Sequence, residues 1–259
     1  MKAAHWTVAV LMLVISGSVQ LPAQEAQHPL IPAIQRAKAA LKNIDANIAD
    51  YSCTLVKRER VDGKLIGPEY MFTKVRHKPF SVYMFFVGPQ SLKGQEALYV
   101  AGANDGKMVA HAGGVGIFLP TLNLNPKGSL AMRGNRYPIT EIGIRTLCVR
   151  LIEIAENDAK FGECTVNWFK DAKVDGRRCT CIQVVHPVRR KNFSFNVARV
   201  YIDDERNIPI RYEAYDWPER TGDRPVLIEE YTYTNIKLNQ RFTDADFDKN
   251  NADYNFKRK

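Results

Sequence analysis

Residues 192–247 read NFSFNVARVYIDDERNIPIRYEAYDWPERTGDRPVLIEEYTYTNIKLNQRFTDADF and determine how the rest of the chain is interpreted. Apolar and polar residues alternate with a period of two from Asn192 to Ile202 and again from Ile208 to Ala214. The polar run Asp203–Asn207 separates these two segments, and Leu227–Asn235 forms a third. Because alternate side chains of a strand point to opposite faces, this spacing predicts strands, and the hairpin-sized gaps make them antiparallel neighbours.

The same signals recur through the rest of the chain. Further strands are predicted at Tyr51–Val61, Glu69–Val75, Phe80–Val87, Glu96–Ala101, Lys107–His111, Cys164–Ala172 and Arg178–His186. The Phe80–Val87 segment is apolar on both of its faces, so we expect both faces of the sheet to be covered there.

Two segments carry the spacing of an amphipathic helix. Pro29–Asp50 places apolar residues every three or four positions, and a second helix is predicted to begin at Pro138 and to end near Gly162. The segment Ala112–Tyr137 contains several glycines and prolines together with apolar residues. A loop of this length inside a compact domain is usually functional, so we expect it to act as a lid.

The N-terminus has the features of an export signal. Lys2 precedes the apolar run Trp6–Ile15, and Leu21-Pro22-Ala23 ends in a small residue. The sequence therefore predicts a signal peptide at residues 1–23 and one mature domain at residues 24–259, soluble in the periplasm or cell envelope. An uncleaved N-terminal anchor is the alternative.

The formal net charge of +9 restricts the choice of partner. Such a surface attracts anionic lipid headgroups, polyanions or an acidic protein. Because no helix-turn-helix, zinc-finger or RNA-binding signature accompanies the charge, nucleic acid is not an expected partner. We expect a monomer whose membrane contact, if any, is peripheral.

Five cysteines lie in a chain that export would expose to oxidation. They are Cys53, Cys148, Cys164, Cys179 and Cys181. The odd count leaves at least one thiol unpaired, and Cys179 and Cys181 share a strand face and cannot easily bridge each other. The pairing of the others stays open. No complete metal-binding pattern is present, because Asp244-x-Asp246-x-Asp248 lacks the glycine and the closing glutamate of a calcium loop. We expect no metal and no cofactor.

Several short motifs resemble those of a known superfamily. They are Val75-Arg76-His77-Lys78-Pro79-Phe80, Gly88-Pro89, Tyr99-Val100, Asn104-Asp105-Gly106-Lys107, Val200-Tyr201-Ile202-Asp203, Ile208-Pro209, Tyr233 to Asn239, and Asp244-Ala245-Asp246-Phe247. In this order they resemble the LolA/LolB-like lipoprotein carriers. Over residues 29–256 the chain resembles more closely an uncharacterised family of exported bacterial proteins, a domain of unknown function related to LolA.

The resemblance implies an α+β fold, with a strongly curved antiparallel sheet that forms an incomplete half-barrel and with helices covering its concave face. It also implies that the concavity takes a lipid acyl chain or another hydrophobic small molecule. The residues predicted to line the ligand site are Val82, Met84, Phe86, Leu98, Val100, Phe193 and Phe195, and Arg76 and Lys78 are predicted to contact a headgroup or a partner. We therefore predict a non-catalytic carrier or sensor of a hydrophobic ligand.

Two other classes of function remain open. A basic module that docks on an acidic envelope polymer or protein would need no ligand cavity. An enzyme could use Cys148 or Cys164 with His186 as a nucleophile pair, but no catalytic motif accompanies these residues.

Overall fold

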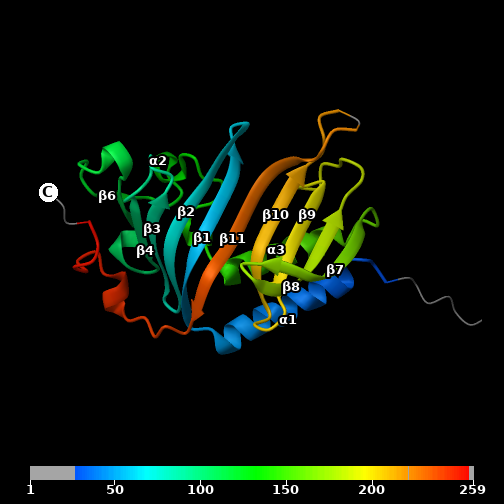
Figure 1. Cartoon of the computed structure of the whole chain (residues 1–259), viewed down its shortest axis with the longest axis horizontal. Coiled ribbons are helices and arrows are strands. Elements are labelled where there is room, and N and C mark those ends of the chain that lie inside the picture. Colours follow the sequence, from blue (N-terminus) through cyan, green and yellow to red (C-terminus); the bar gives the residue numbers. More distant parts are fainter. Residues whose placement is uncertain (1–26, 221, 257–259) are drawn as a thin grey trace, which may run out of the picture.

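The computed structural model describes residues 27–220 and 222–256, which form one sheet with helices packed against it (Figure 1). The predicted signal peptide and its cleavage point lie outside the described residues. The strands are β1 (Asp50–Val61), β2 (Lys64–His77), β3 (Phe80–Gly88), β4 (Glu96–Val100), β5 (Met108–His111), β6 (Leu122–Leu124), β7 (Thr165–Val174), β8 (Arg177–Val185), β9 (Val197–Asp203), β10 (Ile208–Asp216) and β11 (Val226–Leu238).

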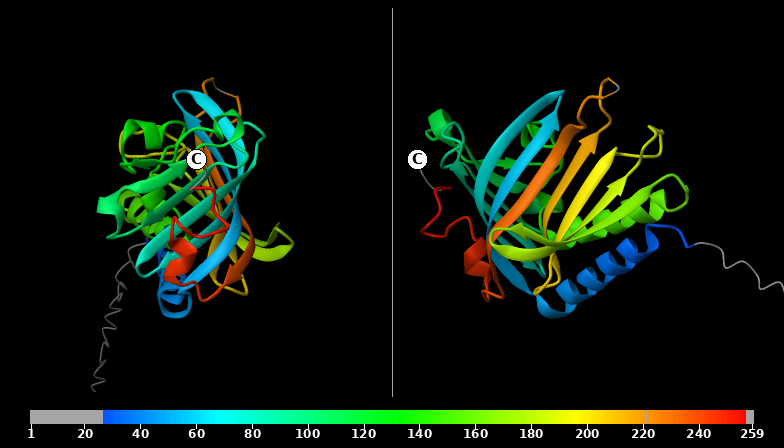
Figure 2. Two further views of the ribbon diagram at one scale, coloured as in Figure 1. Left: turned by 90° about the vertical axis from the view of Figure 1, so that its left-hand side faces the viewer. Right: turned by 45° about the vertical axis from the view of Figure 1, so that its right-hand side comes forward.

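All neighbouring strands are antiparallel, in the order β6-β5-β4-β3-β2-β1-β11-β10-β9-β8-β7. Two meanders, one from each half of the chain, are joined where β1 pairs with β11. The sheet bends strongly but does not close, because β6 and β7 are free edges (Figure 2). The predicted fold class, an incomplete half-barrel with helices, is confirmed.

The helices are α1 (Ile31–Asn47), α2 (Ser129–Met132) and α3 (Ile144–Asp158), with 3-10 turns η1 (Asn104–Gly106), η2 (Gly114–Gly116), η3 (Ile139–Glu141) and η4 (Asp244–Phe247). Ala40 and Ile44 of α1 and Ile144 and Cys148 of α3 are buried in the main core, against strand residues such as Ile210. The two long helices thus cover the concave face over the β8–β11 half of the sheet. No helix among the described residues is both long and apolar enough to cross a membrane.

The convex face is covered where β3 and β4 lie. Residues 239–256, which we call the C-terminal strap, cross this region and bury Phe247, Tyr254 and Phe256 against Tyr83 and Leu98. The rings of Tyr83 and Tyr254 are stacked with centroids 3.8 Å apart. Since the opposite side of β3 faces the main core, the expectation that Phe80–Val87 is covered on both faces is confirmed.

Several element boundaries differ from the predicted ones; β2, for example, begins at Lys64 rather than Glu69. The predicted strand at Asn192 begins only at Val197, because Phe193 stacks on the His186 ring and the Asn196 side chain donates to the His186 carbonyl at 2.9 Å. These contacts bind residues 192–196 into a loop. The first helix ends at Asn47 rather than Asp50, since β1 begins at Asp50.

The second helix begins at Ile144, not at Pro138. Gly143 precedes it with a φ of 115°, which a residue with a side chain rarely adopts, and the Ile144 amide donates to the Tyr51 hydroxyl at 2.9 Å. Pro138 instead leads into the short turn η3. A buried tyrosine from β1 therefore sets where α3 starts.

All five cysteines are buried free thiols. Cys179 and Cys181 do not bridge each other, as expected from their shared strand face. Burial raises the pKa of the Cys148 thiol to about 12, and burial and then the nearby Asp158 raise that of Cys164. Both thiols therefore stay protonated near neutral pH, which disfavours the nucleophile pair with His186.

Candidate functional site

A cavity of about 700 Å³ lies between the concave face of the β1–β5 half of the sheet and residues 112–143. Its apolar lining comes from strands, from residues 112–143 and from α3, and includes Met84, Phe86, Leu92, Met108, Leu122, Leu124, Leu130, Ile139 and Leu147. Because α1 and most of α3 cover the other half of the concave face, most residues over this half come from elsewhere in the chain. The segment predicted as a lid provides them, so the cavity lies directly beneath it.

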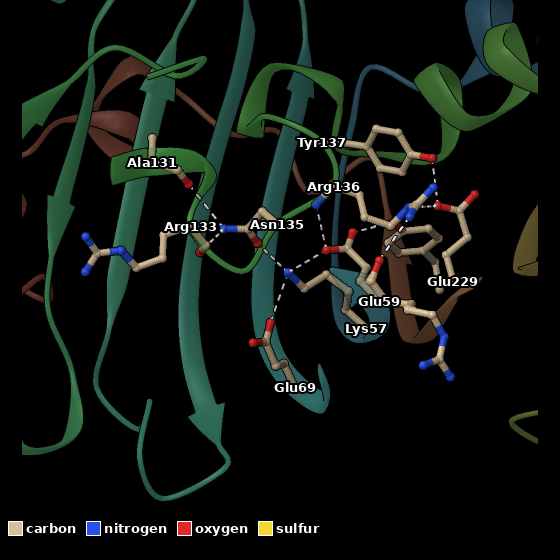
Figure 3. Close-up of polar contacts among 11 residues, drawn as sticks. Lys57, Glu59, Glu69, Ala131, Arg133, Asn135, Arg136, Tyr137 and Glu229 are labelled. Carbon is tan, nitrogen blue, oxygen red and sulfur yellow. Dashed lines mark hydrogen bonds and ion pairs between the residues drawn. The ribbon is translucent and has the colours of Figure 1, made fainter. Parts of the chain in front are cut away.

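Part of the cavity is lined by a buried polar cluster centred on Lys57, whose contacts are drawn in Figure 3. The Lys57 side chain is only 6% exposed, and its ammonium lies 3.0 Å from a Glu69 oxygen and 3.4 Å from a Glu59 oxygen. It also donates to the Asn135 side-chain oxygen. A charge this deeply buried is tolerated only when it is paired and hydrogen-bonded, and Lys57 has three such partners.

The cluster continues to β11 through residues 136 and 137. The Arg136 amide donates to Glu59 at 3.0 Å, and its guanidinium donates to Glu229 at 3.0 Å. The Tyr137 hydroxyl also donates to Glu229, at 2.7 Å, and the Tyr231 hydroxyl donates to Glu59. Three carboxylates and two cations are therefore held together in this cluster, and side chains and the backbone of residues 135–137 are hydrogen-bonded to β1 and β11 (Figure 3).

Both tyrosines of the cluster act as hydrogen-bond donors. Burial, and then the charge of Glu229, raises the pKa of Tyr137 to about 12. The same two causes, together with Glu59, raise the pKa of Tyr231. The hydroxyls stay protonated and neutral, so they stabilise the carboxylates without providing a base. The cluster is thus a set of mutually satisfied charges rather than an activated nucleophile.

The predicted ligand-binding residues are divided among three places. Met84 and Phe86 line the cavity. Val82 is fully buried in the main core on the same face of β3 and is not part of the wall. Leu98 and Val100 pack with the C-terminal strap on the convex face, because the strand period turns them away from the concave side.

Phe193 and Phe195 lie in the loop before β9, where both pack on the His186 ring. They are therefore not part of the cavity wall. The basic pair is also outside it. Arg76 donates to Asp244 at 2.8 Å and lies over the Phe247 ring, so it holds the C-terminal strap, and Lys78 is exposed near the β2–β3 turn.

The polar cluster is not among the features predicted from the sequence, although a signal for it is present. Lys57 and Glu59 continue the alternation of Tyr51, Cys53 and Leu55, so they lie on the buried face of β1. The adjacent charged residues Lys57 to Arg60 suggest a strand end exposed to solvent, so the burial of Lys57 and Glu59 is easily overlooked in the sequence. Residues 135–137 carry no pattern that indicates their contacts with β1 and β11.

Comparison with solved structures returned similar folds at low identity. A putative outer membrane lipoprotein-sorting protein domain from Vibrio parahaemolyticus shares 13% identity, over 84% of this chain and 96% of that one, with a TM-score of 0.40. Lipoprotein LppX of Mycobacterium tuberculosis shares 14% identity, over 82% and 98% of the two chains, with a TM-score of 0.45. A LolA superfamily protein from Nitrosomonas europaea shares 12% identity, over 82% and 97%, with a TM-score of 0.32.

No curated protein was found to match the sequence. A family model does match, over residues 48–256, and its description is "Protein of unknown function (DUF1571)". The match extends from just before β1 to the end of the C-terminal strap and so includes every strand of the sheet. The chain belongs to the DUF1571 family, as its resemblance to an uncharacterised family predicted.

Proposed function

We propose that this protein is an exported, non-catalytic binding protein that holds a lipid acyl chain or another hydrophobic ligand in the cell envelope. The observation that supports this proposal is the cavity of about 700 Å³ beneath residues 112–143. Its size is within the range of roughly 300–1,000 Å³ that is typical of small-molecule sites. Each methylene group buried there contributes about 0.8 kcal/mol, so an acyl chain gains affinity without any catalytic group.

The arrangement of polar groups favours binding over catalysis. The carboxylates of the cluster are all paired or hydrogen-bonded, its tyrosines are donors, and the thiols of Cys148 and Cys164 have raised pKa values. The cluster therefore serves to position residues 135–137 over the cavity. The alternative, a basic docking module with a filled interior, is disfavoured because the interior is hollow.

The experiment compares ligand binding by two alanine-to-phenylalanine variants. Ala110 lines the cavity, whereas Ala39 is exposed on α1. We expect Ala110→Phe to weaken binding of a fluorescent fatty-acid probe by about tenfold or more, because the ring occupies part of the cavity and displaces methylene groups of the ligand. Ala39→Phe should bind as the unaltered protein does.

Native mass spectrometry of the protein purified from its exported compartment provides the second measurement. A bound hydrophobic molecule should be present in the unaltered protein and reduced in Ala110→Phe. The proposal is wrong if no ligand is found and the probe does not bind, or if both variants bind the probe equally well.

A further inference from the structure

An exposed apolar turn projects beside the mouth of the cavity. In this turn, residues 113–120, Val115 is 102% exposed, Phe118 is 94% exposed and Leu119 is 59% exposed. Single exposed apolar residues are common, but three within five positions form a patch that calls for an explanation. Because Val115 and Phe118 contact almost nothing, packing within this chain does not explain them.

The turn is held rigidly although its tip is free. The Gly114 amide donates to the Lys93 carbonyl at 2.8 Å. A Cβ atom at Gly113 would lie 2.3 Å from the Leu92 carbonyl oxygen, and one at Gly114 would lie 2.2 Å from that of Ser91. Only glycine allows this close approach of two backbone segments. The fold thus fixes the base of the turn, and the two apolar side chains are presented in a defined place.

Exposed cations lie beside the turn and the mouth of the cavity. Arg133 is exposed and lines the same cavity as Leu119, and the segment from Lys107 to Tyr137 contains no aspartate or glutamate. Lys93, whose carbonyl anchors the turn, is exposed as well. Apolar side chains at a tip with cations beside it match the interface of an anionic bilayer, where the tip enters the acyl region and the cations meet the headgroups.

The turn is also continuous with the cavity. Leu119 is both exposed and part of the cavity lining, and Pro120 and Leu122 extend the lining from it. An apolar molecule that leaves a bilayer at this point reaches the cavity wall along apolar side chains. A protruding tip also needs no shaped pocket in a fluid bilayer, whereas a protein partner would have to provide one.

We propose that residues 113–120 are a membrane-docking turn that inserts Val115 and Phe118 into an anionic lipid surface. The cations of Lys93 and Arg133 hold the cavity mouth against that surface. The tip of the docking turn is distinct from the cavity, because neither Val115 nor Phe118 is part of the cavity lining.

The test is flotation of the full mature protein with vesicles of phosphatidylcholine alone and of phosphatidylcholine with phosphatidylglycerol. The unaltered protein should bind the anionic vesicles more strongly than the neutral ones. The double variant Val115→Ser/Phe118→Ser should lose about tenfold or more of this binding, since two apolar side chains no longer enter the bilayer. Lys93→Glu should weaken binding to the anionic vesicles only.

The matched control is Val188→Ser/Phe169→Ser, which removes the same residue types at positions 47% and 49% exposed elsewhere on the surface. This variant should bind vesicles within about twofold of the unaltered protein, because neither residue belongs to the docking turn. The fatty-acid probe should bind all of these variants equally, which separates the docking turn from the function proposed for the cavity.

Three results would overturn the inference. The unaltered protein could fail to prefer anionic vesicles, or the docking-turn variant could float as well as the control. Size-exclusion chromatography with light scattering could also show that the unaltered protein is a dimer and that only Val115→Ser/Phe118→Ser is a monomer. The turn would then form an interface with a second copy of this chain.

Discussion

Removal of the Lys57 ammonium should destabilise the protein strongly, because it leaves two buried carboxylates without their cation. Glu59 is 3% exposed and Glu69 is 7% exposed, and both lie within 3.4 Å of the Lys57 nitrogen. Breaking a buried ion pair by removing one partner costs about 3–5 kcal/mol. We therefore expect Lys57→Met to lower the free energy of unfolding by that amount.

A second substitution on the same pair should recover part of the loss. In Lys57→Met/Glu69→Gln only Glu59 stays charged near the lost cation, and it keeps hydrogen bonds from the Arg136 amide and the Tyr231 hydroxyl. The double variant should therefore be more stable than Lys57→Met by about 1–3 kcal/mol, the usual range of coupling between contacting residues. Urea unfolding of both single variants and the double variant, with the m-value checked for two-state behaviour, measures this coupling.

The control cycle uses the exposed pair of Lys38 and Glu156, which lie 2.6 Å apart with side chains 56% and 48% exposed. An exposed ion pair contributes only about 0–1 kcal/mol because water and salt screen it. A loss below about 1 kcal/mol in Lys57→Met, or equal coupling in the two cycles, would show that burial does not make the Lys57 cluster an essential part of the fold.

Three further predictions concern other parts of the fold. Burial raises the pKa of Asp158 to about 6, so its contribution to stability is largest below its unfolded pKa near 3.8 and is lost as the pH rises through 6. In urea titrations, Asp158→Asn should therefore gain stability relative to the unaltered protein as the pH rises from 4.5 to 8. The absence of this trend would contradict the raised pKa. Tyr254→Ala should cost about 3–5 kcal/mol in thermal or urea unfolding, since it removes the ring stacked on Tyr83, and an unchanged midpoint would mean that the C-terminal strap is not part of the stable core. Gly113→Ala should lower the free energy of unfolding by about 1–3 kcal/mol and the melting temperature by several degrees, because the added Cβ meets backbone atoms that cannot move away. Gly162→Ala is the control and should melt like the unaltered protein, since a Cβ there meets nothing within 4 Å.

The sequence by itself determined the strands and the class of fold. Alternation with a period of two needs only local geometry, so it located the segments that became β1–β5 and β7–β11. The two apolar faces of Phe80–Val87 even indicated a cover on each side, which the main core with residues 112–143 provides on one face and the C-terminal strap on the other. The long segment predicted as a lid lies over the cavity, and its action as a lid stays a prediction.

Tertiary structure alone decided which apolar residues surround a hollow and which only pack. Leu98 and Val100 have the same local signature as Met84 and Phe86, but the pairing of β4 with β3 turns them to the convex face beneath the strap. The polar cluster likewise depends on β11, which carries Glu229 and is far from Lys57 and Glu69 in sequence but adjacent to β1 in the sheet. The period of a strand indicates which side chains share a face. Whether a cavity lies next to that face depends on the bend of the whole sheet and on the path of residues 112–143.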